Sequence, residues 1–290
     1  MIKLKLQTLL TLGTLLFGLT LAGSVQAFLV TPCTTPICDV SASDTWGNIN
    51  TSKIFHVDLV ESSGTGVFTP FVRMHAGGND PQPQQGYNTD GTLRFDTQMP
   101  HNFSHSLLLS LVPVVKFGGV EFLEFALDMG EPGNDTSADH FLDLTDGQFF
   151  LASTGNLTPN TFTSGVLNGL GSPVYRLDSN ADNKIILGDL TSGNGRLDYL
   201  WYLPSSKFGT DKTKFVYFYS SYERAGGTFE EWGTCKDPNQ PHGVVVPMSC
   251  AGRAGVPIDP PPVPTPEPSS IILLGSGLLA LARATRNKRN

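Results

Sequence analysis

Short runs in which apolar and polar side chains alternate recur along the middle of the chain. In Lys53–Val60 the two kinds of side chain largely alternate, which is the pattern of a β-strand with one buried face. No stretch of this middle part keeps the apolar period of an amphipathic helix, and residues 139–146 predict one helical turn at most. Similar strand-like runs occupy residues 67–74, 106–115, 120–128, 147–152, 174–177, 184–187, 197–203 and 215–222.

Turn-forming residues separate these runs. Lys116-Phe117-Gly118-Gly119 lies between the runs 106–115 and 120–128 and predicts a β-hairpin. Pro70, in the middle of the run 67–74, restricts that strand to a sheet edge, because proline has no N–H to donate. Roughly ten short strands joined by Gly, Asn and Asp turns predict an all-β body with a β-sandwich or jelly-roll-like fold.

The N-terminus has the three parts of a signal peptide. Lys3 and Lys5 give the positive start, an apolar run follows from Leu9 to Ala22, and Val25-Gln26-Ala27 gives a small-residue cleavage site. We therefore expect a short signal helix and a mature chain that begins at Phe28. The apolar run is roughly 14 residues, which is short for the ~20 of a membrane span. A retained N-terminal anchor is the alternative.

The C-terminus has three parts as well. The Pro-rich stretch 257–268 predicts a stiff, extended linker, because proline fixes φ and lacks the N–H. The apolar segment Ile271 to Ala282 predicts a short transmembrane helix. A basic cluster stays on the cytoplasmic side of a membrane, which would leave the body outside. The basic residues of this end are Arg283, Arg286, Lys288 and Arg289.

Pro266, Glu267 and Pro268 directly precede the apolar segment. The order of motif, apolar segment and basic end resembles the PEP-CTERM sorting signal of Gram-negative bacteria. The resemblance implies that an exosortase recognises the tail and processes it near the motif, and that the C-terminal segment holds the chain in the membrane before processing. The basic end departs from the pattern in that neutral residues interrupt it. An ordinary C-terminal anchor would share the last two parts without needing the motif.

The chain is thus expected to have four parts. Residues 1–27 are the signal peptide, and 28–256 are an extracellular β-sandwich body. Residues 257–268 are the Pro-rich linker with the sorting motif, and 269–290 are the membrane segment with the basic tail. The expected location is the cell surface, the outer envelope or the extracellular matrix.

The middle of the chain is also similar to a group of exported proteins that share this tail. The similarity covers about half of the body, and the group has no assigned activity, so it supports the exported location only. The stretches concerned are 86–90, 122–128 with 131–132, 149–151, 155–158, 174–178, 182–183, 193–195 and 229–232.

Charge is unevenly distributed along the chain. All 26 acidic residues lie within 28–268, whereas six of the 19 basic residues lie in the two ends. This part therefore carries 13 basic and 26 acidic side chains, a formal charge of −13. We expect no nucleic-acid partner, because phosphate binding needs clustered Lys and Arg.

The four cysteines all lie in the exported part, at Cys33, Cys38, Cys235 and Cys250. An even number in an exported chain predicts two disulfides, for which three connectivities are possible. The local pairs Cys33–Cys38 and Cys235–Cys250 are favoured, because each brackets irregular, Pro-containing chain. Zinc binding is the alternative, but the spacing does not suit paired short-spaced thiolates.

The segment that begins at Asp178 has the spacing of a calcium loop, in which a tight turn converges oxygen donors on one cation. Asn183 stands where such loops usually have glycine, and the closing carboxylate is a shorter Asp instead of Glu. The alternative is a polar turn with Asx hydrogen bonds and no metal. The expected ligands are Asp178, Asn180, Asp182, the main-chain carbonyl of Lys184, and Asp189.

Other polar residues give weaker indications. His101 and His105 lie about 13 Å apart if the segment is extended, too far for one metal ion, so we expect surface or turn residues. Glu230-Glu231-Trp232 has the composition of a sugar site. Adjacent residues on a strand diverge, however, and we expect one exposed and one structural Glu. Glu121 and Glu124 should likewise face opposite sides.

The aromatic residues of the last third of the body are expected to be mostly core or cross-strand pairs. An exposed row of aromatic rings could stack on sugar rings.

The chain has no nucleophile elbow, metalloprotease helix motif or phosphate loop. We expect a non-enzymatic cell-surface or biofilm-matrix protein with extracellular polysaccharide as the candidate partner; the alternative is a secreted glycan-active hydrolase on a β-sandwich. The aromatic residues of the last third of the body are Trp201, Tyr202, Tyr217, Tyr219, Tyr222 and Trp232.

Overall fold

The computed structural model describes the body of the chain. It covers residues 29–30, 33, 37–42, 45–59, 66–75, 77, 82–131, 140–189, 196–226, 228–241 and 244–259. The signal peptide, the sorting motif and the membrane segment predicted from the sequence lie outside these residues. Within them, no helix has the length and the apolar character that crossing a membrane requires.

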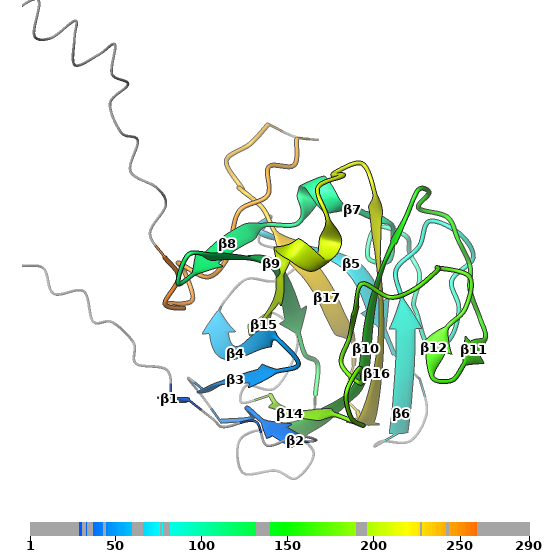
Figure 1. Ribbon diagram of the computed structural model, residues 1–290, viewed down its shortest axis with the longest axis horizontal. Coiled ribbons are helices and arrows are strands. Elements are labelled where there is room, and N and C mark those ends of the chain that lie inside the picture. Colours follow the sequence, from blue (N-terminus) through cyan, green and yellow to red (C-terminus); the bar gives the residue numbers. More distant parts are fainter. Residues whose placement is uncertain are drawn as a thin grey trace, which may run out of the picture.

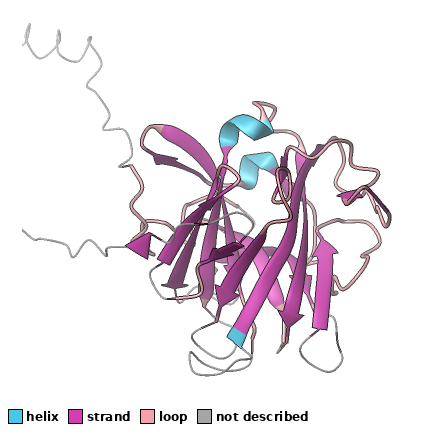
Figure 2. Ribbon diagram, turned by 60° about the horizontal axis from the view of Figure 1, so that its bottom comes forward, coloured by secondary structure: helices cyan, strands magenta, loops and turns pink. Residues whose placement is uncertain are grey.

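Two β-sheets packed face to face form the body (Figures 1 and 2), which confirms the all-β sandwich. β8 (Val114–Phe117) pairs with β9 at the margin of the first sheet. Across that sheet the order is β1 (Leu29–Val30), β3 (Thr45–Ile49), β4 (Ser52–Leu59), β15 (Leu197–Pro204), β9 (Val120–Asp128), β17 (Glu230–Cys235) and β5 (Phe68–Met74).

The second sheet packs against the first. β13 (Tyr175–Arg176) pairs with β10 and β7 (Leu107–Leu108) with β16, while β11 (Phe162–Thr163) and β12 (Val166–Leu167) form a separate hairpin. Two 3-10 turns, η1 (Leu109–Leu111) and η3 (Ser205–Phe208), join strands. The order across the second sheet is β2 (Ile37–Asp39), β14 (Lys184–Gly188), β10 (Phe141–Ala152), β16 (Phe215–Ala225) and β6 (Gln82–Tyr87).

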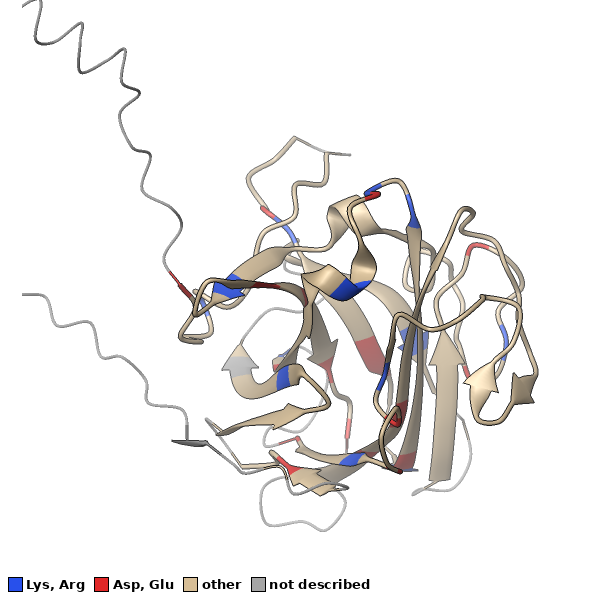
Figure 3. Cartoon of the chain, viewed as in Figure 1, with Lys and Arg blue, Asp and Glu red and all other residues tan. Residues whose placement is uncertain are grey.

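Aromatic side chains fill the space between the sheets. The rings of Phe149 and Phe218 stack at 4.1 Å, and those of Trp201 and Trp232 lie 5.7 Å apart. Burial of each of these four side chains contributes about 2–3 kcal/mol to the stability of the fold. A Cβ on Gly147 would lie 2.7 Å from the Trp201 ring, so this position of β10 has room only for glycine. Few strand positions carry a charge (Figure 3). All six aromatic residues of the last third are buried, which confirms that they are mostly structural.

The loop that follows β6 protects the free edges of both sheets on one side of the sandwich. The main-chain carbonyl of Asp96 accepts a hydrogen bond from the His75 N–H after β5, and its own N–H donates to Gln85 of β6. β5, which contains Pro70, is an edge strand as predicted. The loop thereby pairs groups that would otherwise be open to another chain.

The strand expected over residues 106–115 does not form as one piece. β7 joins the second sheet, η1 follows it, and β8 joins the first sheet. The chain crosses between sheets here, and Pro113 interrupts the run because it has no N–H to donate. The hairpin of β8 and β9 is confirmed, with Gly118 and Gly119 at φ 57° and 80° in its turn.

Residues 141–146, which were expected to contribute to a helical turn, form the first half of β10 instead. Leu142 and Leu144 belong to the core between the sheets. Asp143, between them, forms ion pairs with Lys184 and Arg224. The segment thus has the period of a half-buried strand, which was too short to recognise from the sequence alone.

The C-terminal segment covers the outer face of the first sheet. The disulfide Cys235–Cys250 ties it to the end of β17, and Ala251 and Val256 belong to the buried cluster on that face. The Asp259 carboxylate accepts hydrogen bonds from the N–H groups of Gly118 (3.0 Å) and Gly119 (2.6 Å). Its N–H donates to the Lys116 carbonyl at 2.7 Å. The last described residue is therefore fixed to the tip of the β8–β9 hairpin.

Candidate functional site

Two exposed phenylalanines lie side by side over the outer face of the second sheet. Phe95 is 37% and Phe162 is 39% exposed, and their ring centroids are 5.9 Å apart. Both also contact the Tyr219 ring of β16, at 6.2 Å and 5.2 Å. We call the exposed Phe95 and Phe162, together with the buried Tyr219 beneath them, the aromatic face. The sequence did not indicate it, because positions 95, 162 and 219 come together only through the fold.

The backbone of Phe95 has φ 57°, in the left-handed region that bulky side chains rarely adopt. Its ring packs edge-on against Tyr87 of β6 at 6.0 Å. Backbone outliers of this kind cost free energy and cluster at binding sites, where the surrounding structure holds them in place. The loop therefore presents Phe95 to solvent at a conformational cost.

The β11–β12 hairpin, which carries Phe162, is fastened to the sheet by Gln148 of β10. Its side-chain NH₂ donates to the Gly165 carbonyl at 2.6 Å, and its Oε1 accepts from the Leu167 N–H at 3.0 Å. Arg176 also donates to the Gly165 carbonyl, at 3.4 Å. Gln148 is fully buried, so these bonds fix the hairpin and with it Phe162.

Asp146 lies next to this fastening. Its Oδ2 accepts a second hydrogen bond from the Gln148 NH₂, at 2.6 Å, while its Oδ1 is buried without a partner. Burial raises the pKa of Asp146 to about 6, and the charge of Asp178 adds to the shift. An ionised carboxylate with one unpartnered oxygen is costly unless a proton or a cation compensates it.

The structure brings together part of the expected calcium ligand set. The Asp178 carboxylate accepts from the Asn183 N–H at 2.8 Å, and Asn180 Oδ1 accepts from the Asn183 side chain at 2.9 Å. Asp182 is exposed. The loop thus contains the Asx hydrogen bonds of a polar turn.

The remaining expected ligands lie in or beyond β14. Lys184 begins β14, and its ammonium group pairs with Asp143 and Glu223. Asp189 follows the strand, about 16 Å from its start at ~3.3 Å per residue. The fold does not bring Asp189 to the loop. Calcium binding itself stays a prediction.

Both disulfides of the described residues are the local pairs favoured from the sequence, Cys33–Cys38 and Cys235–Cys250. Among the described residues, one set of three His, Cys, Asp or Glu ligand atoms lies within 4.8 Å, from Glu124, Cys235 and Cys250. Its two cysteines are bonded to each other, which leaves no thiolates for zinc.

Glu124 has a structural role on the outer face of the first sheet. Its carboxylate accepts hydrogen bonds from the Tyr202 hydroxyl (3.0 Å), the Ser249 hydroxyl (2.6 Å) and the Cys250 N–H (2.7 Å). Burial raises its pKa, and these bonds counteract the shift. Glu121 is exposed, so the two glutamates face opposite sides as expected.

Glu230 and Glu231 diverge along β17, but the expectation that one is exposed is wrong. Glu230 is buried beside Glu131 and accepts a hydrogen bond from Gln84. Burial, and then the charge of Glu131, raise the pKa of Glu230 well above its ordinary value. Glu231 is buried as well, paired with Arg73. Long-range partners that the sequence does not show make both burials possible.

The two histidines four positions apart have local partners. A ring nitrogen of His101 lies 3.0 Å from the Ser104 carbonyl, and one of His105 lies 2.7 Å from the Ser106 carbonyl. His101 is exposed in a turn, in agreement with the sequence.

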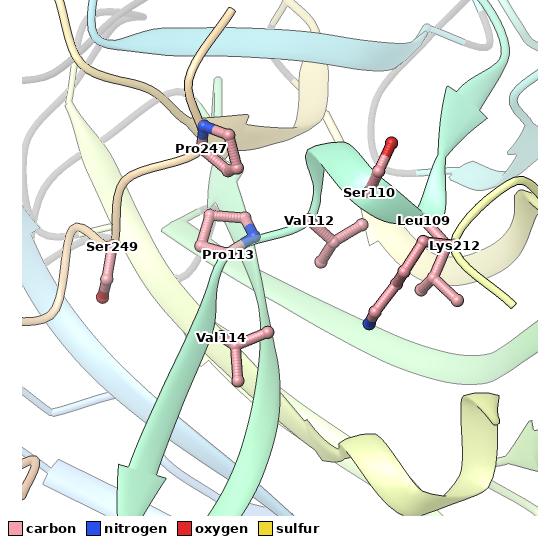
Figure 4. A pocket seen from close by; sticks show the side chains of 8 residues that line it. All are labelled: Leu109, Ser110, Val112, Pro113, Val114, Lys212, Pro247 and Ser249. Carbon is pink, nitrogen blue, oxygen red and sulfur yellow. The ribbon is translucent and has the colours of Figure 1, made fainter. Parts of the chain in front are cut away.

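A pocket of about 350 Å³ opens where β8, the loop before β16 and the C-terminal segment meet (Figure 4). Lys212 is its one charged residue, so the lining offers no pair of carboxylates for acid–base chemistry. Its lining residues are Leu109, Ser110, Val112, Pro113, Val114, Lys212, Pro247 and Ser249.

Comparison with protein families identifies a PEP-CTERM protein-sorting motif at residues 264–289. This range includes the Pro266–Pro268 motif, the apolar segment and all four basic residues of the C-terminal end. Neither the curated proteins nor the solved structures gave a match to the chain.

Proposed function

We propose that this exported PEP-CTERM protein binds extracellular polysaccharide through its aromatic face, without cleaving it. The sorting motif marks the chain for recognition by an exosortase and for delivery to the cell envelope or surface. On our proposal its place of action is the cell surface or the biofilm matrix. The exposed pair of Phe95 and Phe162, in which the backbone of Phe95 is held at a conformational cost, is the observation that carries the proposal.

The chemistry of a sugar ring suits this face. Sugar rings present C–H groups, which pack on aromatic rings, and hydroxyl groups, which need hydrogen-bonding partners at the rim. Gln85 accepts a hydrogen bond from the Tyr219 hydroxyl at 2.7 Å, and Arg94 and Asp96 flank Phe95 in the chain. An apolar pair with polar groups around it is the arrangement expected of a carbohydrate subsite.

The positions of the carboxylates support binding without hydrolysis. A glycosidase needs two carboxyl groups about 5–10 Å apart across an accessible cleft. Glu131 and Glu230 lie beside each other, but both are buried in the body. Glu231 is paired with Arg73, and Glu124 holds the C-terminal segment. These four carboxylates have structural partners and no access to a glycan.

A pull-down of the exported protein with extracellular polysaccharide tests the proposal. The double variant Phe95→Ala/Phe162→Ala should bind about tenfold more weakly, because each lost ring contact is worth about 0.5–1.5 kcal/mol. Val120→Ala is the matched control, since Val120 is 52% exposed but belongs to the first sheet. Equal retention of the double variant and the wild type would overturn the aromatic face as the site. Release of reducing sugar would show a hydrolase instead.

A further inference from the structure

Two acidic residues from distant parts of the sequence, Asp146 and Asp178, lie on adjacent paired segments beside the loop 177–183. The Leu177 N–H donates to the Gly147 carbonyl at 2.8 Å, which places Asp178 close to Asp146 of β10. Burial raises the pKa of Asp146, and the charge of Asp178 adds to the shift. Two carboxylates held together in this way repel each other unless a positive charge lies between them.

Asn183 contributes a buried oxygen next to Asp178, whose carboxylate accepts a hydrogen bond from the Asn183 N–H at 2.8 Å. Its side chain is 1% exposed, and its NH₂ group donates to the Leu177 carbonyl (2.6 Å) and to Asn180 Oδ1 (2.9 Å). Since both acceptors belong to the loop, the amide lies inside it. The amide oxygen, Oδ1, has no hydrogen-bond partner, and neither has Asp146 Oδ1. Unpaired buried acceptors are rare in folded proteins and point to an ion or a water at the site.

We propose that Asp146, Asp178 and Asn183 bind a divalent cation, calcium by preference, through the unpaired oxygens of Asp146 and Asn183 and the second oxygen of Asp178. Calcium takes six to eight oxygen ligands in flexible geometry, so water completes the shell. In this site Asp146 supplies the carboxylate that the sequence pattern assigns to Asp189. The site does not depend on polysaccharide binding, and its test has a different readout.

Arg176 is the competing positive charge near both carboxylates. It forms no ion pair with either of them within the described chain, because its terminal nitrogen donates to the Gly165 carbonyl. Its Nε, moreover, has no hydrogen-bond partner. Burial raises the pKa of both acids, and the charge of Arg176 offsets only part of the shift.

Thermal unfolding of the exported protein in EDTA and in about 10 mM CaCl₂ tests the site. For a millimolar site we expect Tm to rise by about 3–5 °C. Asp146→Asn and Asp178→Asn should abolish the rise. Asp182→Asn is the matched control, because Asp182 is an exposed residue of the same loop and a ligand only in the sequence pattern.

Terbium luminescence provides a measurement on the wild-type protein. Tyr219 of β16 pairs with Gln148 of β10, whose side chain donates to Asp146, so Tyr219 should sensitise terbium bound at the site. Calcium should then displace the emission. The proposal is overturned if the Tm of the wild-type protein does not change with calcium and bound terbium does not emit. It is equally overturned if Asp146→Asn keeps the full rise, or if Asp182→Asn abolishes it.

Discussion

At the scale of single residues, the carboxylates of this protein are distinguished by their partners. Glu230 lies in the core beside Glu131, and the Gly226 N–H donates to both oxygens of Glu131 at 3.1 Å and 3.0 Å. The fold therefore favours the protonated form of Glu230. Protonation of Glu230 contributes fully to the free energy of unfolding below the pKa of the unfolded chain, about 4.3. This contribution is lost as the pH rises through the raised pKa that Glu230 has in the folded protein.

Replacing Glu230 by Gln should remove this loss. The amide can still accept from Gln84 and can donate to Glu131, while it carries no charge at any pH. We expect Glu230→Gln to be more stable than the wild type by about 1–3 kcal/mol at pH 8, with little difference at pH 4. Chemical denaturation at both pH values measures this. Glu121→Gln, on the surface, should behave as the wild type does; a variant less stable at pH 8 would contradict the argument.

Residue identities alone could not reveal either candidate site. Asp178, Asn180 and Asp182 were recognisable because their spacing is local, whereas Asp146 is brought in by strand pairing from 32 positions away. Phe95 looked like any loop residue, since its exposure depends on a left-handed backbone. What spacing encodes could be predicted, and what depends on tertiary contacts could not.

At the scale of elements, strand prediction succeeded where both β-forming residues and alternation were present. β9, β15 and β16 were found, with ends within a few residues. β6, with the sequence QPQQGY, was missed, because it is a polar edge strand whose burial comes from the loop over it. The run 106–115 was overextended, because an apolar segment does not show where it changes sheets.

The β11–β12 hairpin has little sheet of its own and depends on Gln148. Gln148→Ala should raise amide hydrogen exchange at Leu167, which loses its acceptor, and destabilise the body by about 1–3 kcal/mol. Asn168→Ala removes only exposed side-chain bonds to Thr161 and Thr163 and should leave exchange at Leu167 unchanged. Mass spectrometry of peptides after hydrogen exchange distinguishes the two variants. Unaltered protection in Gln148→Ala would show that the hairpin is held by other contacts.

At the scale of the whole molecule, the body is a sandwich with a third, irregular layer on its first sheet. The C-terminal segment supplies that layer and closes the cluster around Phe122 and Tyr202. Glu124 and the disulfide Cys235–Cys250 hold it in place. The strand pattern predicts the two sheets, but a layer without regular structure leaves no periodic signal.

Removing the disulfide Cys235–Cys250 should therefore destabilise the protein more than removing Cys33–Cys38. The two disulfides span 15 and 5 residues, and closing the longer loop restricts the unfolded chain more. We expect Cys235→Ala/Cys250→Ala to lose about 3 kcal/mol of unfolding free energy and to bind a hydrophobic dye, as the first sheet becomes exposed. Cys33→Ala/Cys38→Ala should lose less and bind no more dye than the wild type. Equal losses would refute the role of the third layer.

The hydrogen bonds between Asp259 and the β8–β9 hairpin limit how far from the body the sorting motif can lie. Pro266 follows Asp259 by seven residues, so the sorting motif can reach at most about 25 Å from the hairpin tip. An exosortase that acts on the motif must therefore work close to this corner of the protein. The β11–β12 hairpin lies at the opposite end of the body (Figure 1). With the C-terminal apolar segment in a membrane, as the sequence predicts, a tether this short would keep the aromatic face on the side of the body away from the lipid.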